Sequence, residues 1–333
     1  MLGEKLSIII FGGSGFIGTR LSLRLSQANK SFQIVDKNPS GFFPERVLNA
    51  DIRKPLSLSF SEEPSALINL AAEHRDDVYP LSLYDEVNVD GAKVVCNFAR
   101  ASNINKIIFT SSVAVYGFAP IGTKESGAIS PFNDYGRTKW EAEQIYKEWQ
   151  CEDPHKRTLV IIRPTVVFGE RNRGNVFNLL KQIASGKFIM IGSGLNRKSM
   201  AYVENIAAFL EYALDFKPGT HLYNYIDKPD FTMNSLVMHV NSLLGRSPAI
   251  KLRLPFFVGI LIGSCFDLIA KITGKKFSIS KIRIKKFCAN SVYESAIEST
   301  GFVPPVSLME AIEATVRFEF IEEHKTEQVF YTE

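Results

Sequence analysis

The chain has 333 residues, of which 45% are apolar and 22% are charged, and its formal net charge is +4. This composition excludes a disordered or fibrous chain, and the length suffices for one large domain or two interlocked domains with an ample core. The mild positive charge comes without a run of alternating basic and aromatic residues, so no nucleic-acid partner is expected.

A glycine-rich turn follows the first predicted strand. The apolar run Leu6–Phe11 is typical of a strand buried on both faces, and a helix is predicted over 19–28. A turn between them brings backbone close to a pyrophosphate and places that anion at a helix N-terminus. We therefore predict a dinucleotide cofactor bound by the turn. The turn residues assigned to it are Gly12, Gly15, Phe16, Ile17 and Gly18.

Asp36 indicates which dinucleotide is bound. It ends the apolar run 32–35 and lies about 20 residues after the glycines, where an acid accepts hydrogen bonds from the adenosine ribose hydroxyls. An acid at this position disfavours a 2′-phosphate. NAD is therefore the predicted cofactor, while Lys37 beside it leaves NADP open.

Strand-like and helical segments alternate to about residue 165. The strand-like runs are Leu6–Phe11, Phe32–Val35, Ala66–Leu70, Lys106–Ser111 and Thr158–Arg163. The spacing between them allows helical crossovers, which predicts an α/β fold with a doubly wound parallel sheet. We expect residues 1–169 and about 201–227 to form the nucleotide domain. About 170–200 and 228–325 should form a smaller, interlocked α/β substrate domain, with 326–333 as a loose tail.

Three residues form a candidate proton-transfer site. Ser111 and Ser112 end a strand at the edge of the sheet where ligands bind, and Ser112 is expected to hydrogen-bond a substrate oxygen. Tyr135 and Lys139 are four residues apart, so on a helix they project from one face. An ammonium and a cationic nicotinamide nearby would favour the phenolate of Tyr135 and make it a working base.

Taken together, these motifs resemble the extended short-chain dehydrogenase/reductase family, in its nucleotide-sugar epimerase/dehydratase branch. The resemblance spans about residues 7–318 and implies a Rossmann sheet and a nicotinamide enzyme that acts on a sugar ring carbon. The matching motifs are Gly12-x-x-Gly15-x-x-Gly18, Asp51-Ile52, Asn69-Leu-Ala-Ala72, Asn88, Ser112, Tyr135-x-x-x-Lys139 and Arg163-Pro164.

The resemblance also implies roles for residues that the bare pattern does not assign. Lys139 would hold the nicotinamide ribose as well as the phenolate, and a homodimer would form through a four-helix contact. Further cofactor contacts are implied at Asp51, Ile52, Leu70, Ala71, Ala72, Asn88, Ser111, Tyr135 and Pro164.

The resemblance is weaker in the substrate half. Asn175 and Val176 match a helix start that contacts the sugar nucleotide, and a helix N-terminus suits an anion. By register, Lys198 fits the position of the family's diphosphate-binding arginine better than Arg197 does. An equal alternative is that Arg197 and Lys198 are a solvated pair on the surface. The family's late diphosphate motif is absent, and Arg283 is a candidate to replace it; a solvated basic face is the alternative.

Two departures from the family's sequence pattern reduce the set of reactions expected of this chain. Val166 stands where the family has a sugar-contacting asparagine, so a standard glucose/galactose site is in doubt. Val113-Ala114 stands where dehydratases carry an acid pair, which argues against removal of water. We predict C4 epimerisation of a UDP-linked hexose, with an N-acetylhexosamine preferred, in synthesis of surface polysaccharide precursors.

Three alternatives remain open. A 4-keto nucleotide-sugar reductase would use the same three residues for one half-reaction. An apolar-alcohol dehydrogenase of the sterol type would fit Val166 and the apolar run described below. A nonenzymatic dinucleotide sensor is disfavoured, because a sensor does not need Ser112, Tyr135 and Lys139.

The segment 254–272 is unusually apolar and is interrupted by Pro255, two glycines and Asp267. A buried or dimer-forming helix is the favoured interpretation, and contact with the surface of a membrane that carries lipid-linked sugars is the alternative. The first apolar run is too short for a secretion signal. The protein is therefore expected in the cytoplasm, with peripheral membrane contact as the alternative.

The four cysteines show neither Cys-x-x-Cys spacing nor histidine partners, so no metal site and no disulfide framework is predicted. They are expected to be reduced thiols, as in a cytoplasmic protein.

Overall fold

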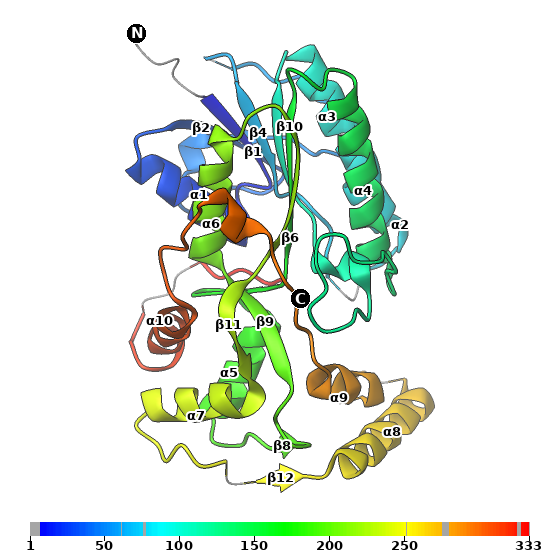
Figure 1. Cartoon of the computed structure of the whole chain (residues 1–333), viewed down its shortest axis with the longest axis vertical. Helices are drawn as coiled ribbons and strands as arrows, with labels where there is room; N and C mark the ends of the chain where they lie inside the picture. The colour runs from blue at the N-terminus through cyan, green and yellow to red at the C-terminus, as the bar shows by residue number, and fades with distance from the viewer. Residues whose placement is uncertain are drawn as a thin grey trace.

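The computed structural model describes residues 7–60, 62–75, 78–250, 252–274, 280–324 and 328–332. Its main sheet has seven strands in the order β10-β6-β5-β4-β1-β2-β3, and all of them pair in parallel. The predicted doubly wound parallel sheet is therefore confirmed (Figure 1). The strands are β1 (Ser7–Phe11), β2 (Ser31–Asp36), β3 (Val47–Asn49), β4 (Ala66–Asn69), β5 (Lys106–Thr110), β6 (Thr158–Pro164) and β10 (Gly219–Tyr225).

Helices cover both faces of this sheet, with α1 and α6 on one side and α3 and α4 on the other (Figure 1). Strands β1, β4 and β6 are buried along their whole length, which explains why they are apolar without alternation. These helices are α1 (Phe16–Gln27), α3 (Gly91–Ala101), α4 (Asp134–Cys151) and α6 (Val203–Tyr212). The shorter helical segments here are η1 (Pro44–Arg46), α2 (Ser82–Tyr84), the π-helix η2 (Asp85–Asp90), η3 (Val113–Tyr116), η4 (Ala213–Asp215) and η5 (Ile297–Thr300).

A smaller α/β part lies beyond the carboxyl ends of the central strands (Figure 1). Its three-stranded sheet has the order β11-β9-β7, and a two-stranded pair joins β12 to β8. Helices α5, α7 and α10 pack with this sheet around a core of their own. The elements are β7 (Val166–Phe168), α5 (Asn175–Ala184), β8 (Met190–Ile191), β9 (Arg197–Tyr202), β11 (Asp227–Thr232), α7 (Met233–Leu243), β12 (Arg253–Leu254) and α10 (Leu308–Phe320).

The apolar segment forms helix α8 (Phe256–Thr273), followed by α9 (Lys281–Cys288). In α8 only Gly259 and Gly263 are buried, so of the favoured interpretation the buried helix is wrong, while the dimer-forming helix stays a prediction. Among the described residues, α8 is the one helix long and apolar enough to cross a membrane. Figure 1 shows α8 and α9 at one corner of the smaller part.

Candidate active site

The glycine turn joins β1 to α1 at the carboxyl edge of the sheet. Gly12 has φ +73°, and a Cβ on it would lie 2.6 Å from the backbone nitrogen of Ala71. A Cβ on Gly18 would lie 2.5 Å from Cα of Gly13, so this glycine lets the helix approach the turn closely. Both positions therefore require glycine for packing.

Gly15 has a different environment from the other two glycines. It is exposed, and a Cβ on it would meet only the carbonyl oxygen of Gly12, at 3.3 Å. Gly15 is also the N-cap of α1, and no side chain caps that helix end in the part of the chain that the structure describes. The first-turn N–H groups are thus available to an anion, which fits the pyrophosphate of a dinucleotide.

Asp36 lies at the end of β2, beside this turn. Its two carboxylate oxygens accept hydrogen bonds from the backbone nitrogens of Ser14, at 3.1 Å, and of Asn38, at 2.9 Å. Burial raises the pKa of Asp36, and these two N–H donors oppose that rise. The glycine turn and Asp36 are therefore held together, an arrangement that fits the adenosine half of NAD.

The remaining cofactor candidates lie at or just after the carboxyl ends of strands of the main sheet. Asp51 is ion-paired with Arg53 at 2.6 Å, which lowers the pKa of Asp51, and Ile52 is 6% exposed in the core next to Gly91. The stretch from Leu70 to Ala72 follows β4 directly. Its first two backbone nitrogens donate to Phe11 and Asn69, at 2.9 and 3.0 Å. Pro164 ends β6 at the same edge of the sheet.

Ser112 and Tyr135 are brought together by the start of α4. Tyr135 is the second residue of α4, and the side chain of Ser112 lies near its hydroxyl, close enough to act on its pKa. Gly136 makes this approach feasible, because a Cβ on it would lie 2.4 Å from the carbonyl oxygen of Ala114. Burial raises the pKa of Tyr135, and the side chain of Ser112 opposes the rise.

Lys139 lies one turn further along α4 and is 2% exposed. Its Nζ is 4.3 Å from the ring centroid of Phe109, a cation–π contact. Burial lowers the pKa of Lys139 to about 7, while the charge of Glu143 opposes the decrease. Burial also lowers the pKa of His74, whose charged form Lys139 disfavours. The site thus holds a lysine that changes charge near neutral pH.

A buried polar network behind Lys139 was not predicted from the sequence. Glu143 and Arg163 form an ion pair at 2.6 Å with side chains 0% and 1% exposed. The Ser111 hydroxyl donates to Glu143 at 2.5 Å, and Arg163 donates to the Tyr116 hydroxyl at 2.7 Å. The hydroxyl of Ser111 is therefore engaged with the core, which favours a structural role over the predicted cofactor contact. The four-residue spacing of Lys139 and Glu143 was the available signal.

Asn88 also has structural partners. Its side-chain nitrogen donates to the carbonyl of Glu73, at 2.9 Å, and to the Thr138 hydroxyl, at 3.0 Å, while its oxygen accepts from the Glu73 nitrogen. These bonds connect the segment after β4 to helix α4. The geometry therefore favours a bracing role for Asn88 over direct contact with the cofactor.

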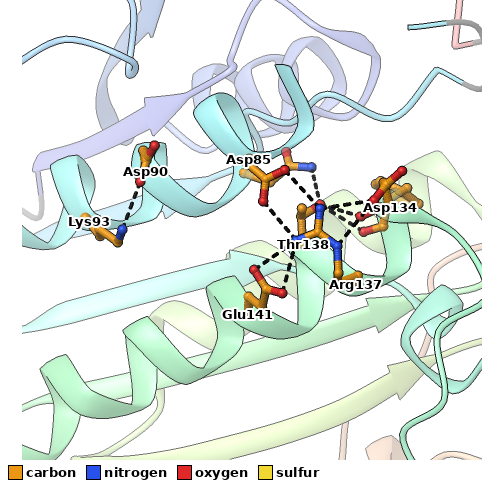
Figure 2. Close-up of polar contacts among 9 residues, drawn as sticks. Asp85, Asp90, Lys93, Asp134, Arg137, Thr138 and Glu141 are labelled. Carbon is orange, nitrogen blue, oxygen red and sulfur yellow. Dashed lines mark hydrogen bonds and ion pairs between the residues drawn. The ribbon is translucent and has the colours of Figure 1, made fainter. Parts of the chain in front are cut away.

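Ion pairs on the outer side of α4 add to this bracing. Figure 2 shows Arg137 between Asp85, Asp134 and Glu141, and the closest distances are 2.8, 3.1 and 3.1 Å. Asp85 belongs to the π-helix η2, so Arg137 links that helix to α4. Helix α4, which carries Tyr135 and Lys139, is thus restrained from two sides.

The predicted substrate residues are spread over the smaller part. Asn175 and Val176 form the start of α5, whose N-cap Gly174 provides no side-chain cap. Lys198 on β9 donates to the carbonyl of Lys286 at 2.7 Å, and burial lowers its pKa to about 8. Arg283 lies in the first turn of α9, where its backbone nitrogen donates to Ser280. Diphosphate contacts of Lys198 and Arg283 remain predictions.

The end of the chain approaches the glycine turn. Residues 328–332 belong to the expected loose tail 326–333, but Phe330 pairs with the 171–173 backbone through two hydrogen bonds of 2.8 Å. The rings of Phe330 and Phe16 are 5.8 Å apart. For these described residues the expectation of a loose tail is wrong, because an apolar ring and backbone pairing hold them; the other tail residues lie outside the described part.

Comparisons with known proteins agree with this geometry. A model of the NAD dependent epimerase/dehydratase family matches residues 8–225. The N-acetyl-alpha-D-glucosaminyl-diphospho-ditrans,octacis-undecaprenol 4-epimerase of Escherichia coli O157:H7 is 46% identical over 330 residues, covering 98% of this chain and 99% of that protein. The UDP-glucose 4-epimerase of Vibrio cholerae is 27% identical over 336 residues, covering 93% and 94%.

Solved structures share the fold. The UDP-glucose 4-epimerase of Thermotoga maritima with UDP-glucose matches with a TM-score of 0.70 at 19% identity, over 94% of this chain and 98% of that one. The UDP-N-acetylglucosamine 4-epimerase of Methanobrevibacter ruminantium, in complex with UDP-N-acetylmuramic acid, matches with a TM-score of 0.68 at 21% identity, again over 94% and 98%.

Proposed function

We propose that this chain, which belongs to the NAD-dependent epimerase/dehydratase family, inverts C4 of an N-acetylhexosamine linked through a diphosphate. The family inferred from the sequence motifs is thereby confirmed, and NAD is its cofactor. The observation that carries the proposal is the placement of Tyr135 near Ser112 at the start of α4, with buried Lys139 on the next turn of the same helix.

In this mechanism the chain moves one proton in each direction. The Tyr135 Oη takes the proton of the C4 hydroxyl, and the Ser112 Oγ, which lies near Tyr135, orients that hydroxyl. Lys139 favours the phenolate by its positive charge. NAD, held by the glycine turn and Asp36, would supply the hydride acceptor and donor for C4. Inversion requires the oxidised sugar to turn over in the site, so that C4 is reduced on its opposite face while Tyr135 returns its proton to the C4 oxygen.

We propose a polyprenol as the carrier of the diphosphate sugar, instead of the nucleotide expected from the sequence. The support is the relative at 46% identity over 98% of this chain, whose name states an undecaprenol substrate. The two carriers share the diphosphate that the start of α5 suits as a helix N-terminus. They differ in what must be accommodated beyond it, an apolar chain in one case and a uridine in the other.

The test is to incubate the purified enzyme with N-acetylglucosamine linked to polyprenyl diphosphate or to UDP, then release and identify the sugar. We expect the galacto epimer from the polyprenyl substrate, the same equilibrium mixture from either epimer, and no net reduction of NAD. Turnover of the UDP-sugar alone would refute the polyprenol carrier. Stoichiometric consumption of NADH with a 4-keto sugar would identify a reductase.

A variant isolates the proton-transfer step. Tyr135→Phe removes the phenol and keeps the ring, so we expect turnover to decrease about 10²–10⁴-fold, with NAD still bound. Retained turnover would contradict the assignment of Tyr135.

A further inference from the structure

Helix α8 carries an unusual apolar stripe on the surface. Phe257, Leu261, Leu268 and Ile272 are 73, 65, 59 and 74% exposed. Their spacings of four, seven and four residues place all of them on one face of the helix. An exposed apolar face of this kind marks a surface that contacts a partner or a membrane.

The opposite face of α8 is fixed to the protein. A Cβ on Gly263 would lie 2.8 Å from the backbone nitrogen of Lys281 and 2.9 Å from the side chain of Ile284, so the glycine allows α8 and α9 to pack closely. The Asp267 carboxylate accepts from the same Lys281 nitrogen at 3.1 Å. The middle of α8 is thus held against α9, so crossing a bilayer would carry Asp267 and the α9 cations into the hydrocarbon.

Helix α9 adds positive charge at the same corner of the protein (Figure 1). Its sequence contains Lys281, Arg283, Lys285 and Lys286 and no acidic residue. All four of these residues are exposed. A second copy of the chain would bring two sets of these cations together across a two-fold contact, which disfavours a dimer through this face. An apolar stripe together with cations instead complements the surface of an anionic bilayer.

Ring contacts connect α9 to the segment that precedes α4. The Nζ of Lys286 is 4.9 Å from the ring centroid of Phe132, which stacks on Phe118 with ring centroids 4.8 Å apart. These two rings are 47 and 69% exposed. Phe132 precedes Tyr135 by three residues, so the contacted segment leads directly into α4.

We propose that α8, α9 and the pair Phe118 and Phe132 form a docking surface for an anionic lipid bilayer. The docking follows from the exposed residues themselves. The purpose of this docking is to deliver a lipid-linked sugar to Tyr135 while its lipid stays in the membrane, and that purpose rests on the proposed function. The apolar stripe inserts at the level of the headgroups, and the α9 cations contact lipid phosphates.

Flotation of the full-length protein with vesicles tests the docking. We expect binding to vesicles of phosphatidylcholine with phosphatidylglycerol, weaker binding to phosphatidylcholine alone, and a decrease at high salt. The double variant Leu261→Asp with Leu268→Asp should lower the bound fraction about tenfold or more, because two carboxylates would enter the interface. The control Val303→Asp changes a residue that is 80% exposed in the loop before α10, and it should bind as the wild type does.

Further measurements decide between outcomes. The variant Lys285→Glu with Lys286→Glu should lose the preference for anionic vesicles. Equal flotation of both double variants and the wild type would overturn the proposal, as would a wild-type dimer in sedimentation velocity that Leu261→Asp dissociates. A protein that does not float but epimerises detergent-dispersed substrate would refute the docking alone. A protein that floats but turns over neither the polyprenyl nor the UDP substrate would refute the proposed function alone.

Discussion

Replacing Lys139 by methionine should stabilise the cofactor-free protein while it removes activity. Burial holds the pKa of Lys139 at about 7, against 10.5 for an ordinary lysine. Because the pKa of Lys139 is lower in the folded protein than in the unfolded chain, the buried ammonium lowers the free energy of unfolding. This loss is complete below pH 7 and disappears as the pH rises toward 10.5. At about 1.4 kcal/mol per pKa unit, the methionine variant should gain about 4–5 kcal/mol at pH 6 and about 2 kcal/mol at pH 9.

Urea unfolding at the two pH values measures this gain, and tryptophan fluorescence reports on it directly because Trp140 and Trp149 both lie on α4 with Lys139. The control is Lys93→Met, which removes an exposed ion pair with Asp90 and should change the free energy of unfolding by less than about 1 kcal/mol at either pH. A gain for Lys139→Met that is equal at pH 6 and pH 9 would refute the reasoning, because the stability cost would then not come from a buried ammonium.

Three further substitutions test the supports of the site. Gly136→Ala places a Cβ 2.4 Å from the Ala114 carbonyl, so α4 must shift; we expect kcat to decrease about tenfold or more, and an unchanged kcat would show that this approach is not needed. Glu143→Gln removes the charge opposite buried Arg163 and should lower the free energy of unfolding by about 3–5 kcal/mol, measured by urea titration. Asp36→Asn should weaken NAD binding about tenfold in calorimetry, with NADP affected less.

Local pattern was sufficient to predict the glycine turn and the helix that carries both Tyr135 and Lys139. The first strand, the glycines and Asp36 are consecutive in the chain, and Tyr135 and Lys139 lie on one helix, so their geometry follows from short-range spacing. Strand β3 was missed because three residues, only partly buried, carry little periodicity.

The contacts that could not be predicted depend on tertiary partners. Asn88 binds Glu73 and Thr138, and Lys198 binds the carbonyl of Lys286, at sequence separations of 15, 50 and 88 residues. A motif match identifies such a side chain as polar and placed near the site. It does not reveal whether a neighbouring segment already uses its donors, so the assigned ligand contacts were the least certain predictions.

Helix α8 shows the same limit for an apolar segment. Its composition is equally typical of a buried helix and of one that lies on a membrane, because hydropathy does not depend on what covers the helix. The two glycines were interpreted as interruptions, whereas Gly259 and Gly263 are the two buried residues of α8 and allow close packing against the rest of the protein. With the small residues facing inward, the large apolar residues must face outward. The position of the glycines on the helix therefore distinguishes the two cases where hydropathy cannot.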